Sequence, residues 1–382
     1  MTRPRGRSEA LRECVRGDAI LRDRPISRVA RAMLRRHGMK LSLGVVAAAI
    51  ALVACSSDSS GTGASPSACP STSSTQSLPG SSGGLTAVTG FAPETENLAM
   101  YVHAPPNVGK DPPIVLALHG CTQGASDYVN AGWNDLADKA GFVVVYGEQS
   151  ASNNPLRCFR WWDPAHTTRD KGEAKALAAM VANARATYGA GGKVYVTGLS
   201  AGAAMTAVML ATYPDVFDAG AIMAGDPYGC ATSEVDAYGC TNPGKTKTAD
   251  EWKALVPSVP GAKAPRVSIW QGDADFTVRP ENEQQLVLQW TAVNGASSTA
   301  TATETVGKAT HARYGDDVES WVIAGMGHGV SIAPKSGCGT AAAFVLDEDL
   351  CSTSKAAEFF GLVTASGAPT APQPAGASAP CR

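Results

Sequence analysis

Charged residues are scarce in this chain, and neither sign of charge dominates. Only 17% of its 382 residues are Asp, Glu, Lys or Arg, and the formal net charge at pH 7 is -2. Proteins that bind nucleic acid carry a strong positive excess on the binding face, so this composition predicts no nucleic-acid partner. The sequence also lacks an internal repeat, so nothing in it predicts a solenoid or a propeller.

Hydrophobic runs of membrane-spanning length are also missing. The main apolar segment, residues 41–54, is shorter than the roughly 20 residues that a transmembrane helix needs. A basic stretch that ends at Lys40 precedes it, and Leu-Val-Ala before Cys55 closes it. This pattern is typical of a bacterial lipoprotein signal peptide, so we expect Cys55 to be lipidated. The alternative is an ordinary secretory signal peptide with an incidental cysteine. Translation from Met33 or Met39 would give a shorter signal peptide of either kind.

Composition divides the chain into four segments. Residues 1–54 are the basic leader and the lipoprotein-type signal peptide. Residues 55–84 are mostly Ser, Gly, Thr and Pro and predict a flexible tether. Residues 85–365 are long enough for one large catalytic domain, and residues 366–382 form an Ala- and Pro-rich tail. We therefore expect an extracellular or outer-membrane-anchored bacterial protein.

Strand-like and helix-like segments alternate through the predicted domain. Continuous apolar runs predict buried strands at 114–118, 142–146, 219–223, 266–270 and 318–323, the last of these being the final strand. Helical patterns cover 132–140, 172–188, 280–293 and 354–363, residues 98–103 predict an antiparallel edge strand, and residues 226–262 an irregular excursion. This alternation predicts an α/β fold with a mostly parallel central sheet and helices on both faces.

The most informative segment runs from Lys193 to Met205. It begins as a β-branched and aromatic strand, ends as a helix of small residues, and has Gly198-x-Ser200-x-Gly202 between them. This is the pattern of a nucleophile elbow, in which a strained strand-to-helix turn lifts the serine hydroxyl clear of the sheet. A Cβ at either glycine would collide with the neighbouring strand or helix. Without partners the same pentapeptide is only a Gly/Ser turn.

A serine nucleophile needs a base, and in hydrolases with this elbow the base follows the serine in the chain. Two histidines follow Ser200, namely His311 and His328. His328 lies in the glycine-rich loop directly after the last predicted strand, at the sheet edge that carries the serine. We therefore predict His328 as the base and keep His311 as the alternative.

The acid that orients this base is expected one strand earlier, in Gln271-Gly-Asp273-Ala-Asp275. Asp275 is placed to reach His328, whereas Asp273 is expected to shape the turn through backbone hydrogen bonds. We predict Asp275 as the acid, with Asp273 as its rival. The alternative for both residues is simple turn formation.

Two backbone N–H groups are needed to stabilise the oxyanion of an ester intermediate. Ala201, at the start of the elbow helix, is expected to supply one, and Cys121, after the strand 114–118, the other. His119 precedes the serine and is expected to hydrogen-bond within its own loop. Trp161 and Trp162 are predicted either to line the substrate pocket or to form a small satellite core.

Ten cysteines suggest disulfides formed in an oxidising compartment. Proximity in sequence favours Cys230–Cys240 and Cys338–Cys351. Cys121–Cys158 would anchor the aromatic loop beside the oxyanion hole, and Cys69–Cys381 would join the two tails. The cysteine spacing does not match a zinc site, so we expect no metal and no cofactor.

Several stretches resemble the polyhydroxybutyrate-depolymerase family of esterases, which includes feruloyl and acetyl-xylan esterases. They are 118–123, 169–173, 194–202, 213–217, 225–230 and 325–329. The resemblance implies an α/β-hydrolase fold and extracellular ester hydrolysis, with Ser200, Asp275 and His328 as nucleophile, acid and base. Ala203, Gly147, Phe159 and Arg160 depart from the family pattern.

The sequence thus predicts a serine carboxylic-ester hydrolase. Its expected substrate is a short-chain polyhydroxyalkanoate or its oligomers, and the alternative is a feruloyl or acetyl ester on plant polysaccharide. A third hypothesis is an inactive surface lipoprotein on the same fold that only binds. No separate polymer-binding domain is apparent, which argues weakly against attack on crystalline polymer.

Overall fold

The computed structural model describes residues 84–106, 108–189 and 191–370. The predicted signal peptide, Cys55, nearly all of the tether and the predicted pair Cys69–Cys381 lie outside these residues. Within the described ranges, no helix combines the length and the apolar character needed to cross a bilayer. The four segment boundaries remain predictions.

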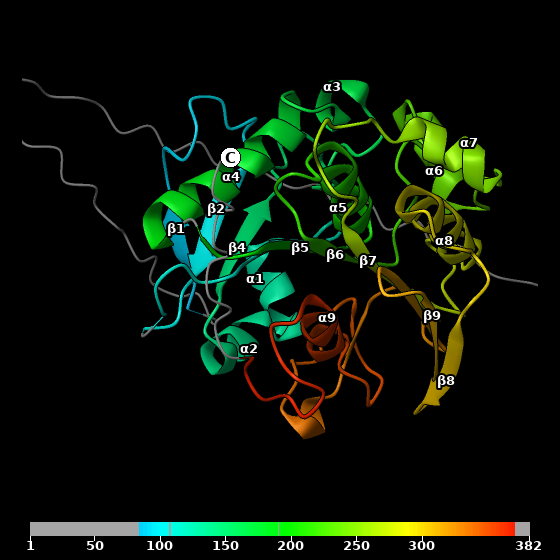
Figure 1. Ribbon diagram of the computed structural model, residues 1–382. Helices are drawn as coiled ribbons and strands as arrows, with labels where there is room; N and C mark the ends of the chain where they lie inside the picture. The colour runs from blue at the N-terminus through cyan, green and yellow to red at the C-terminus, as the bar shows by residue number, and fades with distance from the viewer. Residues whose placement is uncertain (1–83, 107, 190, 371–382) are drawn as a thin grey trace, which may run out of the picture. The chain divides into compact units, whose positions relative to one another are not determined.

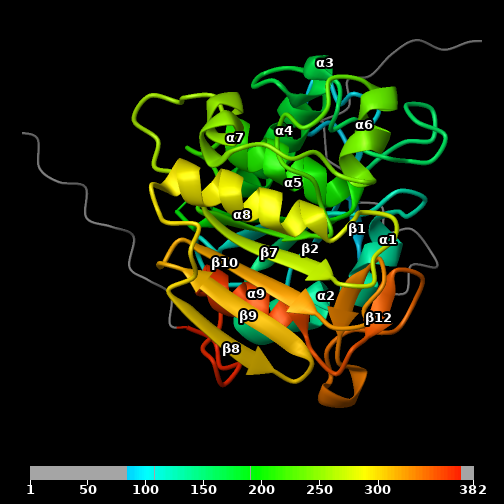
Figure 2. The ribbon, with the colours of Figure 1, turned by 90° about the vertical axis from the view of Figure 1, so that its right-hand side faces the viewer.

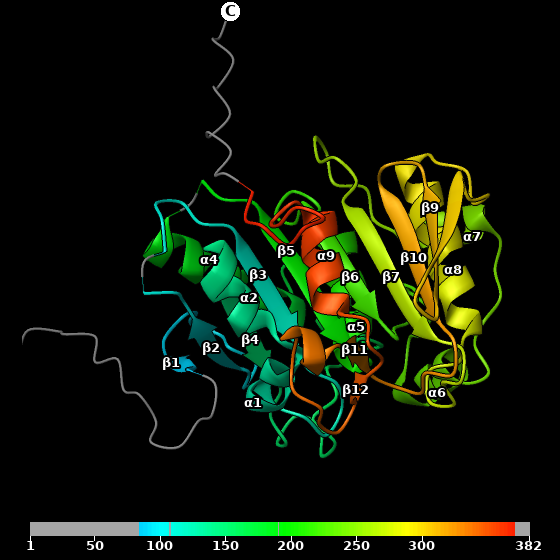
Figure 3. The same ribbon diagram turned by 90° about the horizontal axis from the view of Figure 1, so that it is seen from below.

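The described strands form one ten-stranded sheet and one small two-stranded sheet. The order in the large sheet is β1, β2, β4, β3, β5, β6, β7, β10, β9, β8, as can be followed in Figure 3. The strands from β4 to β10 in this order are parallel, and β1, β2, β9 and β8 are antiparallel to their neighbours. The strand bounds are β1 Thr86–Val88, β2 Ala99–His103, β3 Ile114–Leu118, β4 Val143–Glu148, β5 Val194–Leu199, β6 Ala219–Met223, β7 Arg266–Gly272, β8 Ala302–Val306, β9 Ala309–Tyr314, β10 Val318–Ile323, β11 Val330–Ile332 and β12 Val345–Asp347.

Helices cover both faces of the large sheet, as the sequence predicts. Figure 1 shows α4, α5 and α8 on one face and α2 and α9 on the other. The helix bounds are α1 Ala125–Tyr128, α2 Trp133–Ala140, α3 Pro164–Thr167, α4 Gly172–Tyr188, α5 Ala201–Thr212, α6 Glu234–Thr241, α7 Ala249–Leu255, α8 Glu281–Asn294 and α9 Ser352–Phe360. The α/β prediction is confirmed.

The central strands are apolar along their whole length because each is covered from both sides. Every residue of β3, β5 and β6 is buried. Successive side chains of a strand point to opposite faces. Accordingly Val196 belongs to the core under α4 and α5, whereas its neighbour Tyr195 stacks on Phe360 of α9 with ring centroids 4.6 Å apart.

The structure differs from the sequence-based prediction in four details. Residues 98–103 are not at the sheet edge, because β1 pairs outside β2. The β8–β9 hairpin, which extends the sheet beyond β10 in Figure 2, is missed because β8 is polar and exposed almost throughout. The excursion 226–262 is not irregular, since it contains α6 and α7, capped by the side chains of Ser233 and Thr248. The short β11 and β12 also follow the strand that was expected to be the last.

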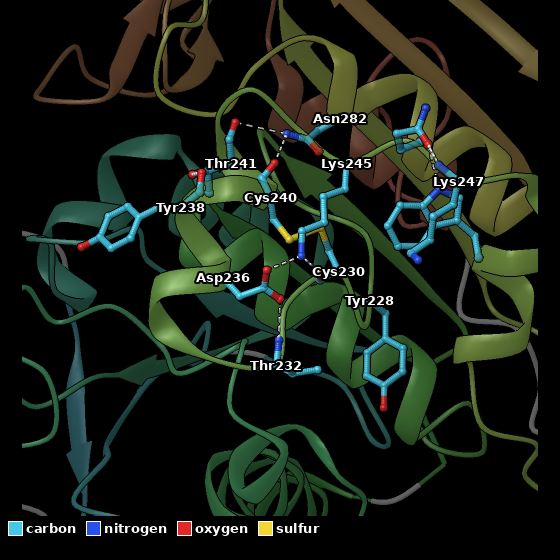
Figure 4. Close-up of a disulfide and its surroundings, with 12 residues drawn as sticks. Tyr228, Cys230, Thr232, Asp236, Tyr238, Cys240, Thr241, Lys245, Lys247 and Asn282 are labelled. Atoms are coloured by element: carbon cyan, nitrogen blue, oxygen red, sulfur yellow. Dashed lines mark hydrogen bonds and ion pairs between the residues drawn. A yellow bond between two sulfur atoms is a disulfide. The ribbon is translucent and has the colours of Figure 1, made fainter. Parts of the chain in front are cut away.

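Three of the predicted disulfides are confirmed: Cys121–Cys158, Cys230–Cys240 and Cys338–Cys351. Figure 4 shows how the second one closes the excursion after β6. The Lys245 ammonium donates to the Asp236 carboxylate and to the Cys230 carbonyl, which ties α6 to the disulfide. Tyr238 points away from this cluster and is 66% exposed.

Candidate active site

Ser200 sits in a strained turn between β5 and α5. Its φ of 57° and ψ of -121° are unusual for a residue with a side chain. The Ser200 N–H donates to the Met223 carbonyl at the end of β6, and the Ser200 carbonyl accepts from the Ala204 N–H in α5. These bonds hold the strained conformation, which turns the serine side chain out of the buried strand.

The two glycines that flank Ser200 are required by close backbone contacts. A Cβ on Gly198 would lie 2.3 Å from the Gly202 carbonyl oxygen. A Cβ on Gly202 would lie 2.3 Å from the Leu118 carbonyl oxygen and 2.5 Å from that of His119. The predicted reason for both glycines is therefore confirmed. The same contacts bring the start of α5 against the loop that follows β3.

His328 and Asp275 meet at the carboxyl edge of the sheet. The loop after β10 carries His328 and the loop after the neighbouring β7 carries Asp275. The Nδ1 atom of His328 donates to the Oδ2 atom of Asp275 at 2.7 Å. The His328 side chain is 10% exposed and the Asp275 side chain is fully buried. This bond orients the imidazole, and with the proton on Nδ1 the Nε2 atom is a hydrogen-bond acceptor.

Backbone and side-chain donors hold the Asp275 carboxylate in place. Its Oδ1 atom accepts from the N–H groups of Thr277 and Val278 at 2.8 and 3.0 Å, and its Oδ2 atom also accepts from Gln271 Nε2 at 3.3 Å. Four donors therefore surround a fully buried anion, and they offset the loss of water. Asp273 accepts instead from the Gly325 N–H at 2.6 Å, which ties the turn after β7 to the loop of His328.

His311, the alternative base, lies in a different cluster. It is part of β9 and is 3% exposed. Its Nε2 atom is 2.9 Å from Glu319 and its Nδ1 atom 3.0 Å from Glu304, so carboxylates occupy both ring nitrogens. Its ring stacks on Trp321 with centroids 3.8 Å apart. The structure therefore brings Asp275 together with His328 and not with His311.

The two predicted oxyanion donors belong to segments that touch each other. Gly120 approaches Leu199, the residue before the nucleophile, and Gly202 packs on the carbonyls of Leu118 and His119. These contacts bring the loop that precedes Cys121 against the start of α5, where Ala201 begins the helix. In the loops and turns of the described ranges, neither N–H donates to a backbone carbonyl.

His119 supports the loop in front of these amides, as the sequence predicts. Its Nδ1 atom donates to the Gly120 carbonyl at 2.7 Å, and its Nε2 atom accepts from the Gln149 N–H at 3.0 Å. Burial lowers the pKa of His119 to about 4, so the ring is neutral and both bonds fit one tautomer.

A buried carboxylate that the sequence analysis did not assign fixes the aromatic loop. Glu173, at the start of α4, is fully buried. It accepts from Gln149 Nε2 at 2.7 Å and from the backbone N–H and Nε of Arg160, each at 2.8 Å. Gln149 therefore links this carboxylate to His119 and the oxyanion loop. Glu173 lies in a stretch that the family resemblance includes, but the sequence gives no sign of these contacts.

Trp161 and Trp162 are mostly buried, with 7% and 9% exposure. Their rings meet edge to face at 5.8 Å and belong to the core under α4 and α5. The packing role is therefore clear for both residues, whereas a pocket role remains a prediction.

Asp226, just after β6, is a second buried carboxyl group that the sequence analysis missed. It is 1% exposed, and its Oδ1 atom has no hydrogen-bond partner. Burial, together with the Asp275 charge, raises the pKa of Asp226 to about 8. In the described part of the chain, no group of three or more His, Cys, Asp or Glu side chains is placed to hold a metal ion.

Comparison with known proteins identifies the family. The esterase PHB depolymerase family model matches residues 97–313. Poly(3-hydroxyalkanoate) depolymerase C of Paucimonas lemoignei is 43% identical over 291 residues, which are 73% of this chain and 70% of that protein. An acetylxylan esterase of Coprinopsis cinerea is 34% identical over 67% of this chain and 71% of that protein. An acetyl xylan esterase structure from Aspergillus awamori aligns with a TM-score of 0.63 and 28% identity, over 73% of this chain and 99% of that one. The chain therefore belongs to the esterase PHB depolymerase family and has the α/β-hydrolase fold.

Proposed function

We propose that this esterase uses Ser200 as nucleophile, His328 as general base and Asp275 as the acid that orients the base. The observation that carries the proposal is the 2.7 Å hydrogen bond from His328 Nδ1 to Asp275 Oδ2. It fixes the imidazole tautomer in which Nε2 can accept the serine proton. The strained conformation of Ser200, between β5 and α5, supports the same assignment.

Each step of the reaction then has a residue in this chain. Ser200 Oγ attacks the ester carbonyl carbon while His328 Nε2 accepts its proton, and the amides of Cys121 and Ala201 stabilise the oxyanion. The imidazolium returns the proton to the leaving alcohol. Water then attacks the acyl-enzyme by the same route and releases the acid. Each oxyanion donor is worth about 3 kcal/mol of barrier in enzymes of this kind.

A short-chain polyhydroxyalkanoate, or its oligomers, is the proposed substrate. One relative named as a poly(3-hydroxyalkanoate) depolymerase is 43% identical, against 34% for one named as an acetylxylan esterase. Large apolar side chains are also exposed on segments that follow the carboxyl ends of several strands: Leu156, Phe276 and Phe344 on loops, and Val235 and Tyr238 on α6. A polyhydroxyalkanoate has no free hydroxyl groups along its chain and is less polar than a hydrated polysaccharide, so exposed apolar side chains on these segments favour the polyester.

The acetyl or feruloyl ester of a plant polysaccharide is the second candidate, because the acetyl xylan esterase structure aligns over nearly its whole length. Hydrolysis of 3-hydroxybutyrate oligomers, acetylated xylan and methyl ferulate should be compared at equal enzyme concentration. We expect kcat/KM to be at least tenfold higher for the oligomers. A preference for acetylated xylan or methyl ferulate would refute the polyester assignment.

Hydrolysis of a simple ester tests the third hypothesis, that the protein is an inactive lipoprotein that only binds. The wild-type domain should hydrolyse p-nitrophenyl butyrate, and Ser200→Ala should reduce kcat by more than a thousandfold without changing the circular dichroism spectrum. A wild-type enzyme that is folded but inactive on every ester would support the binding hypothesis instead.

Lipid anchoring through Cys55 is also a proposal. Three disulfides in the described domain support export to an oxidising compartment. In a Gram-negative expression host, the wild-type chain should incorporate radiolabelled palmitate and fractionate with membranes, whereas Cys55→Ser should do neither. Equal labelling of both chains would contradict this assignment.

A further inference from the structure

Asp226 has features that structural packing alone does not require. It follows β6 at the same sheet edge as Ser200, whose N–H bonds to Met223 of that strand. The chain before it is packed tightly, since a Cβ on Gly225 would lie 2.8 Å from the Cβ of Ala203 in α5. Burying a carboxyl group that is 1% exposed and has an unpartnered oxygen costs folding free energy.

Asp226 and Asp275 lie at the ends of neighbouring parallel strands. Met223 of β6 pairs with Trp270 of β7, and the Ala224 N–H continues the ladder to the Trp270 carbonyl. The chains therefore leave the sheet side by side. The Asp275 charge is felt at Asp226, where together with burial it raises the pKa.

Their surroundings differ in one decisive respect. Asp275 has four donors on its two oxygens and is kept as the anion that faces His328. Asp226 has no donor on Oδ1, which is buried without a hydrogen-bond partner. At neutral pH two buried carboxyl groups at such a site hold one negative charge between them, and the group with the hydrogen-bond donors takes it.

We propose that Asp226 is a positioning residue of the active site, a reserve acid that is neutral beside Asp275 at neutral pH and whose carboxylate supports His328 when Asp275 loses its charge or when the pH rises. This inference rests on the proposed Ser200–His328–Asp275 assignment. In the wild-type enzyme the neutral Asp226 leaves the single charge of Asp275 to orient the base. With Asn at position 275, the repulsion is removed, the pKa of Asp226 falls, and its carboxylate stabilises the imidazolium from the adjacent loop.

The test is a double-mutant cycle on p-nitrophenyl butyrate hydrolysis. Asp275→Asn alone should lower kcat/KM by about a hundredfold to a thousandfold, less than the roughly ten-thousandfold loss seen when an orienting Asp has no substitute. Asp226→Asn added to Asp275→Asn should cause at least a further tenfold loss. Equal activity of the single variant Asp275→Asn and the double variant would overturn the proposal.

The pH profile gives a second readout that a packing role would not change. Burial and Asp275 place the pKa of Asp226 at about 8. Its ionisation adds negative charge near the imidazolium, so the wild-type kcat should rise several-fold above pH 8, while Asp226→Asn should lack this rise. Identical profiles for the two proteins would also overturn the proposal.

Controls separate this inference from the proposed function. Asp316→Asn removes one exposed carboxylate from the turn between β9 and β10 and should leave the pH profile unchanged. If Asp226→Asn does not fold, Asp226→Ser removes the same carboxyl with a smaller side chain. If Ser200→Ala or His328→Ala retains wild-type activity, the proposed function is wrong. If both of these variants are inactive but the double-mutant cycle shows no further loss, only the proposed role of Asp226 is wrong.

Discussion

Replacing Gly202 with alanine would place one methyl group against the backbone of the segment that carries Cys121, one of the two proposed oxyanion donors. The new Cβ would lie 2.3 Å from the Leu118 carbonyl oxygen and 2.5 Å from the His119 carbonyl oxygen. Both atoms belong to main chain, which cannot rotate away as a flexible side chain can. Either α5 or the loop after β3 must therefore shift by about 1 Å to restore ordinary contact distances.

A shift of this size separates the two proposed oxyanion donors. The N–H of Ala201 moves with α5 and the N–H of Cys121 moves with the loop, so one of them loses its contact with the oxyanion. Loss of one donor typically lowers kcat by a hundredfold to a thousandfold, or about 3 to 4 kcal/mol of barrier. Overpacking should also destabilise the fold by about 1 to 3 kcal/mol.

The assay is steady-state hydrolysis of p-nitrophenyl butyrate, with urea denaturation of the same samples. We expect a large fall in kcat and little change in KM. Gly109→Ala is the matched control, because a Cβ on Gly109 meets nothing within 4 Å. A kcat for Gly202→Ala within threefold of the wild type, in a folded protein, would refute the link between this glycine and the oxyanion donors.

Three further predictions concern buried groups. The fold raises the pKa of Asp226 from 3.8 to about 8, so the free energy of unfolding of the wild type falls as the pH rises from 4 to 8. Asp226→Asn has no carboxyl group to ionise. It should therefore raise the free energy of unfolding in urea at pH 8 by an amount on the order of 5 kcal/mol and change it little near pH 4. Removing the Cys121–Cys158 bridge, which spans 37 residues, should lower the free energy of unfolding by about 4 kcal/mol in non-reducing denaturation and reduce kcat more than it raises KM. Glu173→Gln should lower the melting temperature, measured calorimetrically, because it leaves the Arg160 guanidinium with a neutral partner in place of the carboxylate; an unchanged melting temperature would contradict this role.

The strands and helices that were predicted from sequence are those with a strong local signal. The apolar runs of β3 and β6 can lie only in a sheet covered on both sides, and α4 has the predicted bounds 172–188. The β8–β9 hairpin has no such signal, because β8 is exposed and is held by pairing to β9. Its place in the sheet depends on its partner strand and not on its own side chains.

The residues of the candidate site show the same contrast between local and long-range signals. The position of Ser200 follows from a turn that only its flanking glycines allow, and this constraint is local. Chain order and loop position also predicted Asp275 for His328. The hydrogen-bond network of Glu173, Gln149 and His119 joins segments that are distant in the chain, and the residue types alone do not predict it.

By itself, the sequence determined the elbow, the mostly parallel sheet and the pool of acids and bases that could serve Ser200, because each depends on patterns within a few residues. Only the tertiary structure decided that His328 and not His311 bonds to Asp275, and that the Oδ1 atom of Asp226 is buried without a hydrogen-bond partner. Hydrogen-bond partners and protonation states depend on burial and on distances between separate loops. Those quantities exist only once β6, β7 and β10 lie side by side in the folded sheet.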